Sequence, residues 1–362
     1  MVAVRSTRLI DQVSSIRLSL AQSGVQLTDM SRAGTLEQGL ADVADLDHAT
    51  ETAAAGPVEI VRLEGPIRAR QITPAPPGAS RFRYFLDGSQ KSIPVGRIDL
   101  DPIVVAFSAS GILVRDDTGQ PRLLGESLRV NQDWIIPLES GNPATNSLIH
   151  EVINVGGLIH DPFRTLDGDP LEFEPGNYAR ALRLAFDLAG RLRAREELAL
   201  INLWSNQLAP DDPDSWLVID GPLRGDTPRA VGLVKSLQTQ QLAAQEAVAL
   251  FNLLPGNRTS AFRYAHSASS DETSEGRGKT MWYMRLWSAT GMDARHSLVR
   301  IETTNDVDTS DQIDEISSWI LAERLPRATE DPRWPTLLYP IHYLERILKR
   351  RLAALTTGWP ST

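Results

Sequence analysis

The chain has 362 residues, of which 41% are hydrophobic and 23% charged, and it contains no cysteine. This length suits one large domain or two ordinary ones and is sufficient to bury a sizeable core. The lack of cysteine excludes disulfides, thiolate nucleophiles and cysteine-based zinc sites. Any metal must therefore be held by carboxylates and histidine, which suits Mg²⁺ or Mn²⁺.

The net charge is −9 and the sequence pI is near 5.3. These values argue against a basic nucleic-acid-binding domain. They argue less against a nuclease, because acidic residues that bind metal count as negative only until the metal is bound. No apolar stretch approaches the roughly 18 residues of a membrane span, and residues 1–5 lack an apolar signal core. We therefore expect a cytoplasmic protein without membrane association.

Helical patterns open the chain. Apolar residues at helical spacing predict amphipathic helices over residues 5–22 and 35–54. Gly56-Pro57 ends this part of the chain. We predict residues 1–55 to be an N-terminal helical arm that contacts a second copy or a partner, and 56–362 to be the main domain.

Strand patterns dominate the next part, and we expect strands over residues 57–64, 82–87, 102–107 and 111–114. Ser108-Ala109-Ser110 separates the last two as a hairpin-like turn. Gly, Pro, Asn and Asp are frequent in residues 116–176, so this segment is expected to form loops around short elements.

The second half mixes helices and strands. Helices are predicted over residues 177–208, 238–253, 310–324 and 335–355. Strands are predicted over residues 216–220, 230–236, 260–265, 280–287 and 297–303. This order predicts an α/β fold with a mixed sheet rather than a regular parallel one.

Two Asp-Gly pairs follow apolar runs. Asp87-Gly88 follows Tyr84-Phe85-Leu86, and Asp220-Gly221 follows Trp216-Leu217-Val218-Ile219. Each predicts a carboxylate at the end of a buried strand, where glycine permits a tight turn. Phosphodiester cleavage with two metal ions needs carboxylates from separate elements. The alternative is two ordinary turns, since Asp-Gly is common in turns.

The pair Glu196-Glu197 lies on the longest predicted helix and offers a third carboxylate. Only one of the two can point inward, because adjacent helical residues are about 100° apart. The alternative is a solvated face on which the pair forms salt bridges with Arg191, Arg193 and Arg195.

Four further residues have side chains suited to phosphate chemistry. His342 lies on the C-terminal helix as a candidate ligand or proton donor, the alternative being a surface or capped histidine. Lys235 lies at a strand exit, where it either contacts phosphate or the attacking water or is simply a lysine at the end of a strand. Arg285 and Arg300 lie on strands, where they either bind phosphate or form structural ion pairs. The sequence has no Gly-x-Ser-x-Gly elbow, phosphate-binding loop or dinucleotide fingerprint, which disfavours a serine hydrolase or an ATPase.

In their order, these segments resemble the NurA nuclease family. The matching pieces are Leu86-Asp87-Gly88-Ser89, the helical region 193–197, Val218-Ile219-Asp220-Gly221-Pro222-Leu223, Val231-Gly232-Leu233-Val234-Lys235-Ser236, Trp282-Tyr283-Met284-Arg285-Leu286, and Trp334-Pro335 through His342. The resemblance covers about residues 80–345.

This resemblance implies a ribonuclease-H-like core flanked by helices and a nuclease site that uses two Mn²⁺ or Mg²⁺ ions. It implies that Asp87, one of Glu196 and Glu197, Asp220 and His342 are metal or catalytic residues and that Lys235 lines the site. It also implies a homodimer that cleaves DNA together with a hexameric HerA-type ATPase, in the resection of DNA ends for repair or in phage defence.

Two positions depart from the family pattern. Pro222 replaces a serine after the second Asp-Gly pair, and Trp334 replaces a tyrosine that precedes the C-terminal proline. Tryptophan supplies no phenolic hydroxyl. These departures keep open a second reading, a catalytically inactive ribonuclease-H-like interaction subunit of the ATPase complex, and RNA also remains open as a substrate.

Overall fold

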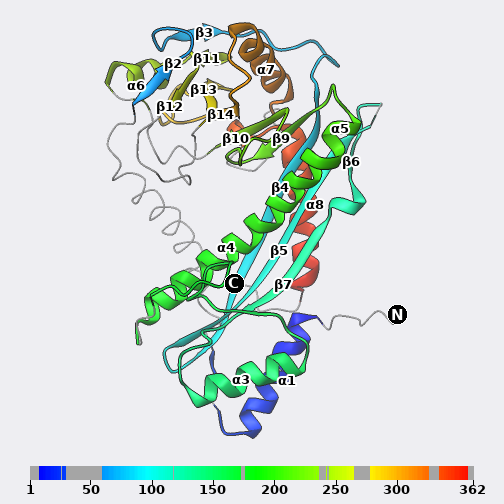
Figure 1. The fold of residues 1–362 in the computed structure, drawn as a ribbon, viewed down its shortest axis with the longest axis vertical. Helices are drawn as coiled ribbons and strands as arrows, with labels where there is room; N and C mark the ends of the chain where they lie inside the picture. The colour runs from blue at the N-terminus through cyan, green and yellow to red at the C-terminus, as the bar shows by residue number, and fades with distance from the viewer. Residues whose placement is uncertain are drawn as a thin grey trace.

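The computed structural model describes residues 8–25, 27–29, 59–116, 118–172, 176–235, 242, 244–264, 278–325 and 334–357. Within them, one mixed sheet of 14 strands runs through the molecule (Figure 1). Its main path is β2-β12-β13-β14-β10-β9-β4-β5-β7-β8. Most neighbours are antiparallel, whereas β9 runs parallel to both β4 and β10, and β7 runs parallel to β8. The fold is therefore mixed α/β, as predicted.

The strands on the main path are β2 (Ile60–Arg62), β12 (Phe262–Tyr264), β13 (Lys279–Arg285), β14 (Leu298–Thr304), β10 (Ala230–Val234), β9 (Trp216–Asp220), β4 (Phe82–Ile98), β5 (Asp101–Arg115), β7 (Arg129–Ile135) and β8 (Ile159–His160). Four short strands pair beside this path: β1 (Thr28–Asp29), β3 (Ala69–Gln71), β6 (Pro121–Leu123) and β11 (Asn257–Thr259). The helices are α1 (Leu9–Gln22), α3 (Pro143–Asn154), α4 (Tyr178–Leu203), α5 (Ala209–Asp211), α6 (Ala244–Phe251), α7 (Ser310–Glu323) and α8 (Tyr339–Leu355). Short 3₁₀ turns lie at η1 (Gly125–Ser127) and η3 (Trp334–Thr336), and a π-helical turn, η2 (Trp204–Leu208), continues α4.

The antiparallel pair β4 and β5 forms the longest ribbon of the sheet. Two predictions about it are wrong. The segments 102–107 and 111–114 belong to one continuous strand, in which Ser108 pairs with both Gln90 and Asn131. β4 likewise does not end at Asp87 but continues to Ile98. The sequence suggests a break in both strands because small and polar residues occur within them. The strands continue through these residues, where helices cover both faces of the sheet.

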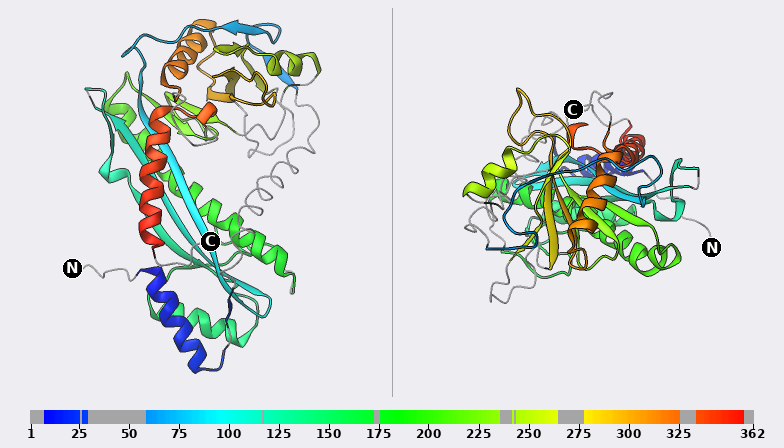
Figure 2. Two further views of the ribbon diagram at one scale, coloured as in Figure 1. Left: turned by 180° about the vertical axis from the view of Figure 1, so that it is seen from behind. Right: turned by 90° about the horizontal axis from the view of Figure 1, so that it is seen from above.

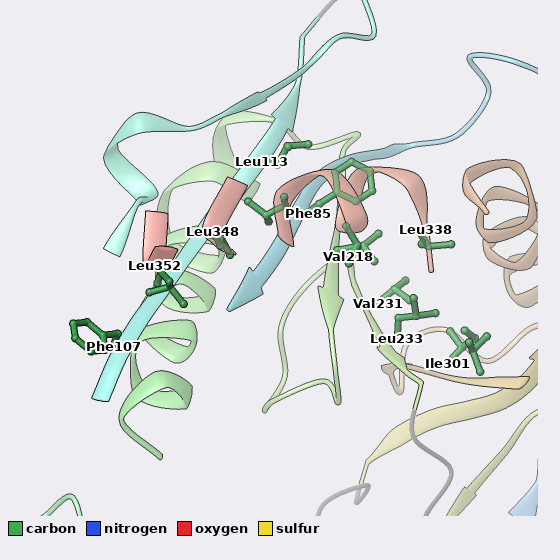
Figure 3. Packing of buried hydrophobic residues seen from close by; sticks show 14 of the residues in the cluster. Phe85, Phe107, Leu113, Val218, Val231, Leu233, Ile301, Leu338, Leu348 and Leu352 are labelled. Carbon is green, nitrogen blue, oxygen red and sulfur yellow. The ribbon is translucent and has the colours of Figure 1, made fainter. Parts of the chain in front are cut away.

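Helices α4 and α8 cover opposite faces of this ribbon (Figures 1 and 2). Leu344, Leu348 and Leu352 of α8 belong to the same hydrophobic core as Phe85 and Phe107 (Figure 3). On the other face, Leu200 and Ile201 of α4 pack with Leu86 and Ile112. Because successive strand residues point to opposite faces, odd-numbered positions around residue 85 face α8 and even-numbered ones face α4.

The N-terminal helix α1 packs into the core. α1 lies beside α3 at one end of the molecule (Figure 2), and its apolar side chains Leu9 and Ile16 join the core shared with β4 and β5. Trp134 of β7 donates a hydrogen bond of 3.2 Å to Gln12. The predicted helix over 35–54 lies outside the described residues. The sequence reading also missed α3, which lies in the segment expected to be loops.

At the other end of the sheet, a buried ion-pair network joins β11 to α7. The Arg258 guanidinium is fully buried and donates to both carboxylate oxygens of Glu64, at 2.6 and 2.8 Å, and to Asp314 at 2.5 Å. The amide of Ala261 and the hydroxyl of Ser310 also donate to Glu64. Burial by itself raises the pKa of Glu64, but these hydrogen bonds outweigh it and lower the pKa to about 2.

None of the helices in the described ranges is both long enough and apolar enough to cross a membrane.

Candidate active site

The carboxylate of Asp87 is buried in the middle of β4, with 5% of the residue exposed. Burial raises its pKa well above the usual range, and the nearby charge of Asp220 raises it further. Lys235 opposes this rise, whereas Glu345 and Glu197 add to it. Asp87 therefore lies within a group of acidic side chains that come from different elements.

Asp220 ends β9, the strand parallel to β4. Because Leu86 and Ile219 are paired across the two strands, Asp87 and Asp220 follow at the next position on each. Lys235 follows β10 and donates a hydrogen bond of 2.7 Å from Nζ to Oδ2 of Asp220. The prediction that a strand ends at Asp220 is confirmed. The chain leaves β9 through Gly221, whose φ of +126° favours glycine.

The structure distinguishes the two adjacent glutamates of α4. Glu197 is buried, and a Cβ atom built on Gly88 would lie only 2.1 Å from its Oε1. Glu196 faces Arg195, with 3.9 Å between its Oε1 and the Arg195 Nε. Of the two candidates, Glu197 is thus the one that joins the acidic group.

Gly88 has a role other than the one predicted. It lies within β4 and is paired with Ser110 of β5, so it makes no turn. It points toward α4 and leaves the space that the Glu197 carboxylate occupies. The glycine is required here for close approach rather than for backbone conformation.

An arginine of the same helix lies against the negative charge of Glu197. The Arg193 Nη1 lies 3.3 Å from Oε1 of Glu197 and donates a hydrogen bond of 3.2 Å to the carbonyl of Gly88. Burial raises the pKa of Glu197, Arg193 and Arg224 lower it, and the charge of Asp220 raises it again. Glu197 and Asp220 are therefore close enough to interact electrostatically.

The charges of these acidic side chains act on one another where the pairing of β4 with β9 ends. By strand alternation Asp87 and Asp220 point toward α8, whereas Glu197 approaches beside Gly88 from the α4 side. The pairing of β4 with β9 ends at Leu86, although β4 continues. Past this point no β9 backbone separates the two faces, so carboxylates from both sides act on one another.

Helix α8 contributes a carboxylate that the sequence reading missed. Glu345 is buried and forms an ion pair with Lys349, with 2.8 Å between Oε1 and Nζ. Its charge raises the pKa of Asp87. His342 lies three residues earlier, half-buried, with its Nδ1 atom shielded from solvent. Residues three apart share one side of a helix, so the spacing of His342 and Glu345 was the signal available in the sequence.

Side chains of β13 and β14 hold the loop after Asp220 in place. Glu302 of β14 accepts a hydrogen bond of 3.0 Å from the amide of Leu223, and Lys279 of β13 donates to the carbonyl of Leu223. Lys279 also lies 3.3 Å from Glu302. The loop packs so closely on β10 that a Cβ on Gly232 would lie 2.4 Å from the Leu223 nitrogen.

Two predicted substrate residues are instead structural. The buried guanidinium of Arg285 donates to backbone carbonyls, those of Phe251, Leu253, Ala294 and His296. Arg300 pairs with Glu302, with nitrogen–oxygen distances of 2.9 and 2.7 Å. With these donors used inside the fold, we correct the prediction that Arg285 and Arg300 bind phosphate in favour of their alternative reading as structural residues.

Trp334, at the departure from the family pattern, packs on another tryptophan. Its ring centroid lies 5.5 Å from that of Trp287, and the Arg324 guanidinium lies 4.2 Å from the Trp287 centroid. This aromatic contact gives Trp334 a packing role at the entry to α8.

The donor set has the chemistry that Mg²⁺ and Mn²⁺ prefer, since Asp87, Asp220 and Glu197 supply hard oxygen ligands from three elements. Burial and neighbouring negative charge disfavour the ionised forms of Asp87 and Glu197, and a divalent cation would relieve both effects. In the described part of the chain, no three acidic or histidine side chains are already gathered as a metal-binding group. The Lys235 ammonium and the Arg193 guanidinium supply the compensating positive charge beside Asp220 and Glu197.

A scan against protein-family models finds no match for this chain, and no curated protein matches it.

Proposed function

We propose that the chain is a metal-dependent nuclease that hydrolyses phosphodiester bonds in DNA with two Mn²⁺ or Mg²⁺ ions. The observation that carries this proposal is the position of Asp87 and Asp220 at corresponding places on neighbouring parallel strands, with Glu197 acting on the same group. Separate elements supplying buried carboxylates to one place is what a two-metal site requires.

The strand arrangement supports a ribonuclease-H-like core. Along the path β7-β5-β4-β9-β10, three antiparallel strands are followed by two that run parallel to β4. A ribonuclease-H-like core is a mixed sheet of this kind, with acidic residues on adjacent strands and on a flanking helix. Asp87 on β4, Asp220 on β9 and Glu197 on α4 are consistent with that arrangement.

In this proposal Asp87, Asp220 and Glu197 would hold the ions, and bound ions would supply an activated water and stabilisation of the leaving oxygen. Lys235, which pairs with Asp220, would be available to contact the phosphate or the attacking water. His342 acts as a ligand or as a proton donor to the leaving group. Glu345 adds negative charge on the α8 side of Asp87 and increases the attraction for divalent cations.

The proposed partners rest on the resemblance to the NurA family alone. We propose a homodimer that works with a hexameric HerA-type ATPase in DNA end resection for repair or in phage defence. A translocating motor that holds the duplex accounts for a nuclease with a net charge of −9.

One specific observation favours the second reading, an inactive interaction subunit. Asp220 is paired with Lys235 at 2.7 Å, and an inactive protein retains such a pair as a structural contact. In that case α4 and the carboxylates of Asp87 and Asp220 serve the fold only.

A cleavage assay separates the two readings. Labelled single- and double-stranded DNA is incubated with the full chain in Mn²⁺, Mg²⁺ or EDTA, with and without the ATPase. We expect metal-dependent cleavage that Asp87→Asn, Asp220→Asn and Glu197→Gln each abolish. Glu196→Gln is the matched control, because Glu196 faces Arg195 rather than the acidic group, and we expect this substitution to leave cleavage intact. Full Mn²⁺-dependent activity in Asp87→Asn would make the assignment wrong, and no cleavage under any condition would favour the inactive subunit.

A further inference from the structure

The solvent-facing side of α8 carries an ordered row of aromatic and basic residues. Tyr339, Tyr343, Arg346 and Arg350 are all exposed, the two tyrosines by 48% and 37%. Their spacing of four, three and four residues places them along one line of the helix surface. At 1.5 Å per residue this row, the α8 stripe, is about 16 Å long.

The stripe lies opposite the face that α8 buries. Leu344, Leu348 and Leu352 pack into the core against the sheet (Figure 3), which leaves the tyrosine rings facing solvent. Exposed tyrosines repeated at helical spacing have no role in that core. Their position suits a ligand with flat apolar surfaces.

The helix is also a local excess of positive charge in an acidic protein. From Glu345 onward it carries one acidic residue and four basic ones, Arg346, Lys349, Arg350 and Arg351, while the chain as a whole has a net charge of −9. Lys349 is paired with Glu345. Neither Arg346 nor Arg350 has an ion-pair partner in the part of the chain that the structure describes, so both guanidinium groups remain available to an anion.

The stripe is continuous with the candidate active site. At about 100° per residue, His342 and Lys349 lie on the flank of α8 between the stripe and Glu345. Glu345 in turn faces the group around Asp87, whose pKa it raises. An elongated ligand bound along the stripe would therefore pass His342 on its way to the acidic group.

We propose that the α8 stripe binds a single DNA strand and guides it to the acidic group around Asp87, an inference that rests on the proposed function. Aromatic side chains that stack on bases, interleaved with cations that follow the phosphates, are the usual means of binding a single strand without reading its sequence. The proposal specifies an unpaired strand because bases within a duplex stack on one another and leave no faces for Tyr339 and Tyr343.

The test is the equilibrium binding of a fluorescein-labelled 20-nucleotide oligo-dT to the full chain, measured by fluorescence anisotropy in EDTA. We expect Tyr339→Leu and Tyr343→Leu each to weaken binding about fivefold or more, because they remove a stacking surface. Tyr339→Phe and Tyr343→Phe retain the ring and are expected to bind within about twofold of the wild type. This contrast separates stacking from a role of the hydroxyl.

Arg350 and Arg351 form a matched pair for the charged half of the stripe. Both are exposed on the same helix, but Arg351 lies about 100° away from the line of the stripe. Arg350→Ala is expected to weaken binding more than Arg351→Ala and to reduce the slope of log affinity against log salt by about 0.7, the value for one phosphate contact of a single strand.

Equal binding by the leucine variants and the wild type, or equal losses from Arg350→Ala and Arg351→Ala, would overturn the proposal. So would leucine variants that bind DNA normally but change the sedimentation coefficient, because the stripe would then be a contact between copies of this chain. The assay needs no cleavage. Binding that depends on the stripe in a chain that cuts no DNA would refute only the proposed nuclease activity, and cleavage with unaffected stripe variants would refute only the stripe.

Discussion

A Cβ atom on Gly88 would lie 2.1 Å from Oε1 of Glu197, so the helical carboxylate fills space that only a glycine on β4 leaves open. The relationship joins a position within the strand to a position within α4. It selects Glu197 over Glu196 and explains why a glycine directly follows the buried Asp87.

Gly88→Ala should abolish or strongly reduce cleavage without unfolding the protein. The added methyl forces the Glu197 carboxylate out of its position, and displacing a catalytic group by about 1 Å costs roughly 100-fold in rate. The measurement is the Mn²⁺-dependent cleavage rate together with thermal unfolding. Gly190→Ala on α4 is the control, because its nearest neighbour would be 3.9 Å from the new Cβ and its activity should be unchanged. Wild-type activity in Gly88→Ala would show that Glu197 does not contribute.

Asp87→Asn should increase stability at neutral pH while it abolishes cleavage. Burial and the neighbouring charges raise the pKa of Asp87 in the native state. Between its unfolded pKa, about 3.9, and the raised native value, the native state binds more protons than the unfolded state. The free energy of unfolding attributable to Asp87 is therefore greatest at low pH and falls as the pH rises through that window.

In the wild type the Gly88 amide donates a hydrogen bond of 2.8 Å to Oδ1 of Asp87. The asparagine side chain retains an oxygen that can accept this bond but carries no charge. We expect a gain on the order of 1–3 kcal/mol near pH 8 and little difference near pH 4. Thermal unfolding of both proteins from pH 4 to 8, without divalent ions, measures this. A difference that shrinks as the pH rises would contradict the explanation.

Lys235→Met should make the apoprotein less stable and more responsive to divalent ions. Lys235 and Asp220 are both partly exposed, so we expect the loss to be only about 1 kcal/mol. Without the ammonium, Asp220 has one competing cation fewer, and the Mn²⁺ concentration that gives half of the thermal shift should fall. Lys235→Arg retains a cation and should resemble the wild type. An unchanged Mn²⁺ response in Lys235→Met would mean that the ions do not bind at Asp220.

Glu64→Gln should destabilise the end of the sheet that contains β11 and α7. It removes the main partner of a fully buried guanidinium, a change that costs about 3–5 kcal/mol. In the wild type the low pKa of Glu64 contributes stability above its unfolded pKa, and this contribution is lost as the pH falls toward about 2. Acid unfolding monitored between pH 5 and 2 should therefore be steeper in the wild type than in the variant. Identical acid profiles would contradict this assignment.

The sequence predicted well the elements whose hydrophobic period is regular. The strands around Trp216–Asp220 and Lys279–Arg285 and the helices around α4, α7 and α8 lie close to their predicted ranges. Their side chains face one dominant environment, so the period of apolar residues reports the structure directly.

Elsewhere, tertiary packing outweighed the local pattern. Gly88 and the run Ser108-Ala109-Ser110 have the composition of turns, yet they lie inside long strands because helices cover both faces of the ribbon. The candidate site shows the same limit. Asp87 and Asp220 were predictable from their apolar runs. The spacing of His342 and Glu345 indicated only that these two residues share one side of a helix, because the place of Glu345 beside Asp87 depends on how α8 packs on β4.

The position of Asp87 within a strand, rather than at its end, has a further consequence. Residues on both sides of it are paired with β5, so its backbone has little freedom to adjust, whereas Asp220 borders the Gly221 loop. Asp87 is therefore held on both sides within its strand, whereas Asp220 is the last paired residue of its own. A fixed donor lowers the entropy lost when an ion binds, and its rigidity favours ions of one size. Discrimination between Mg²⁺, Mn²⁺ and the larger Ca²⁺ should accordingly be set by β4.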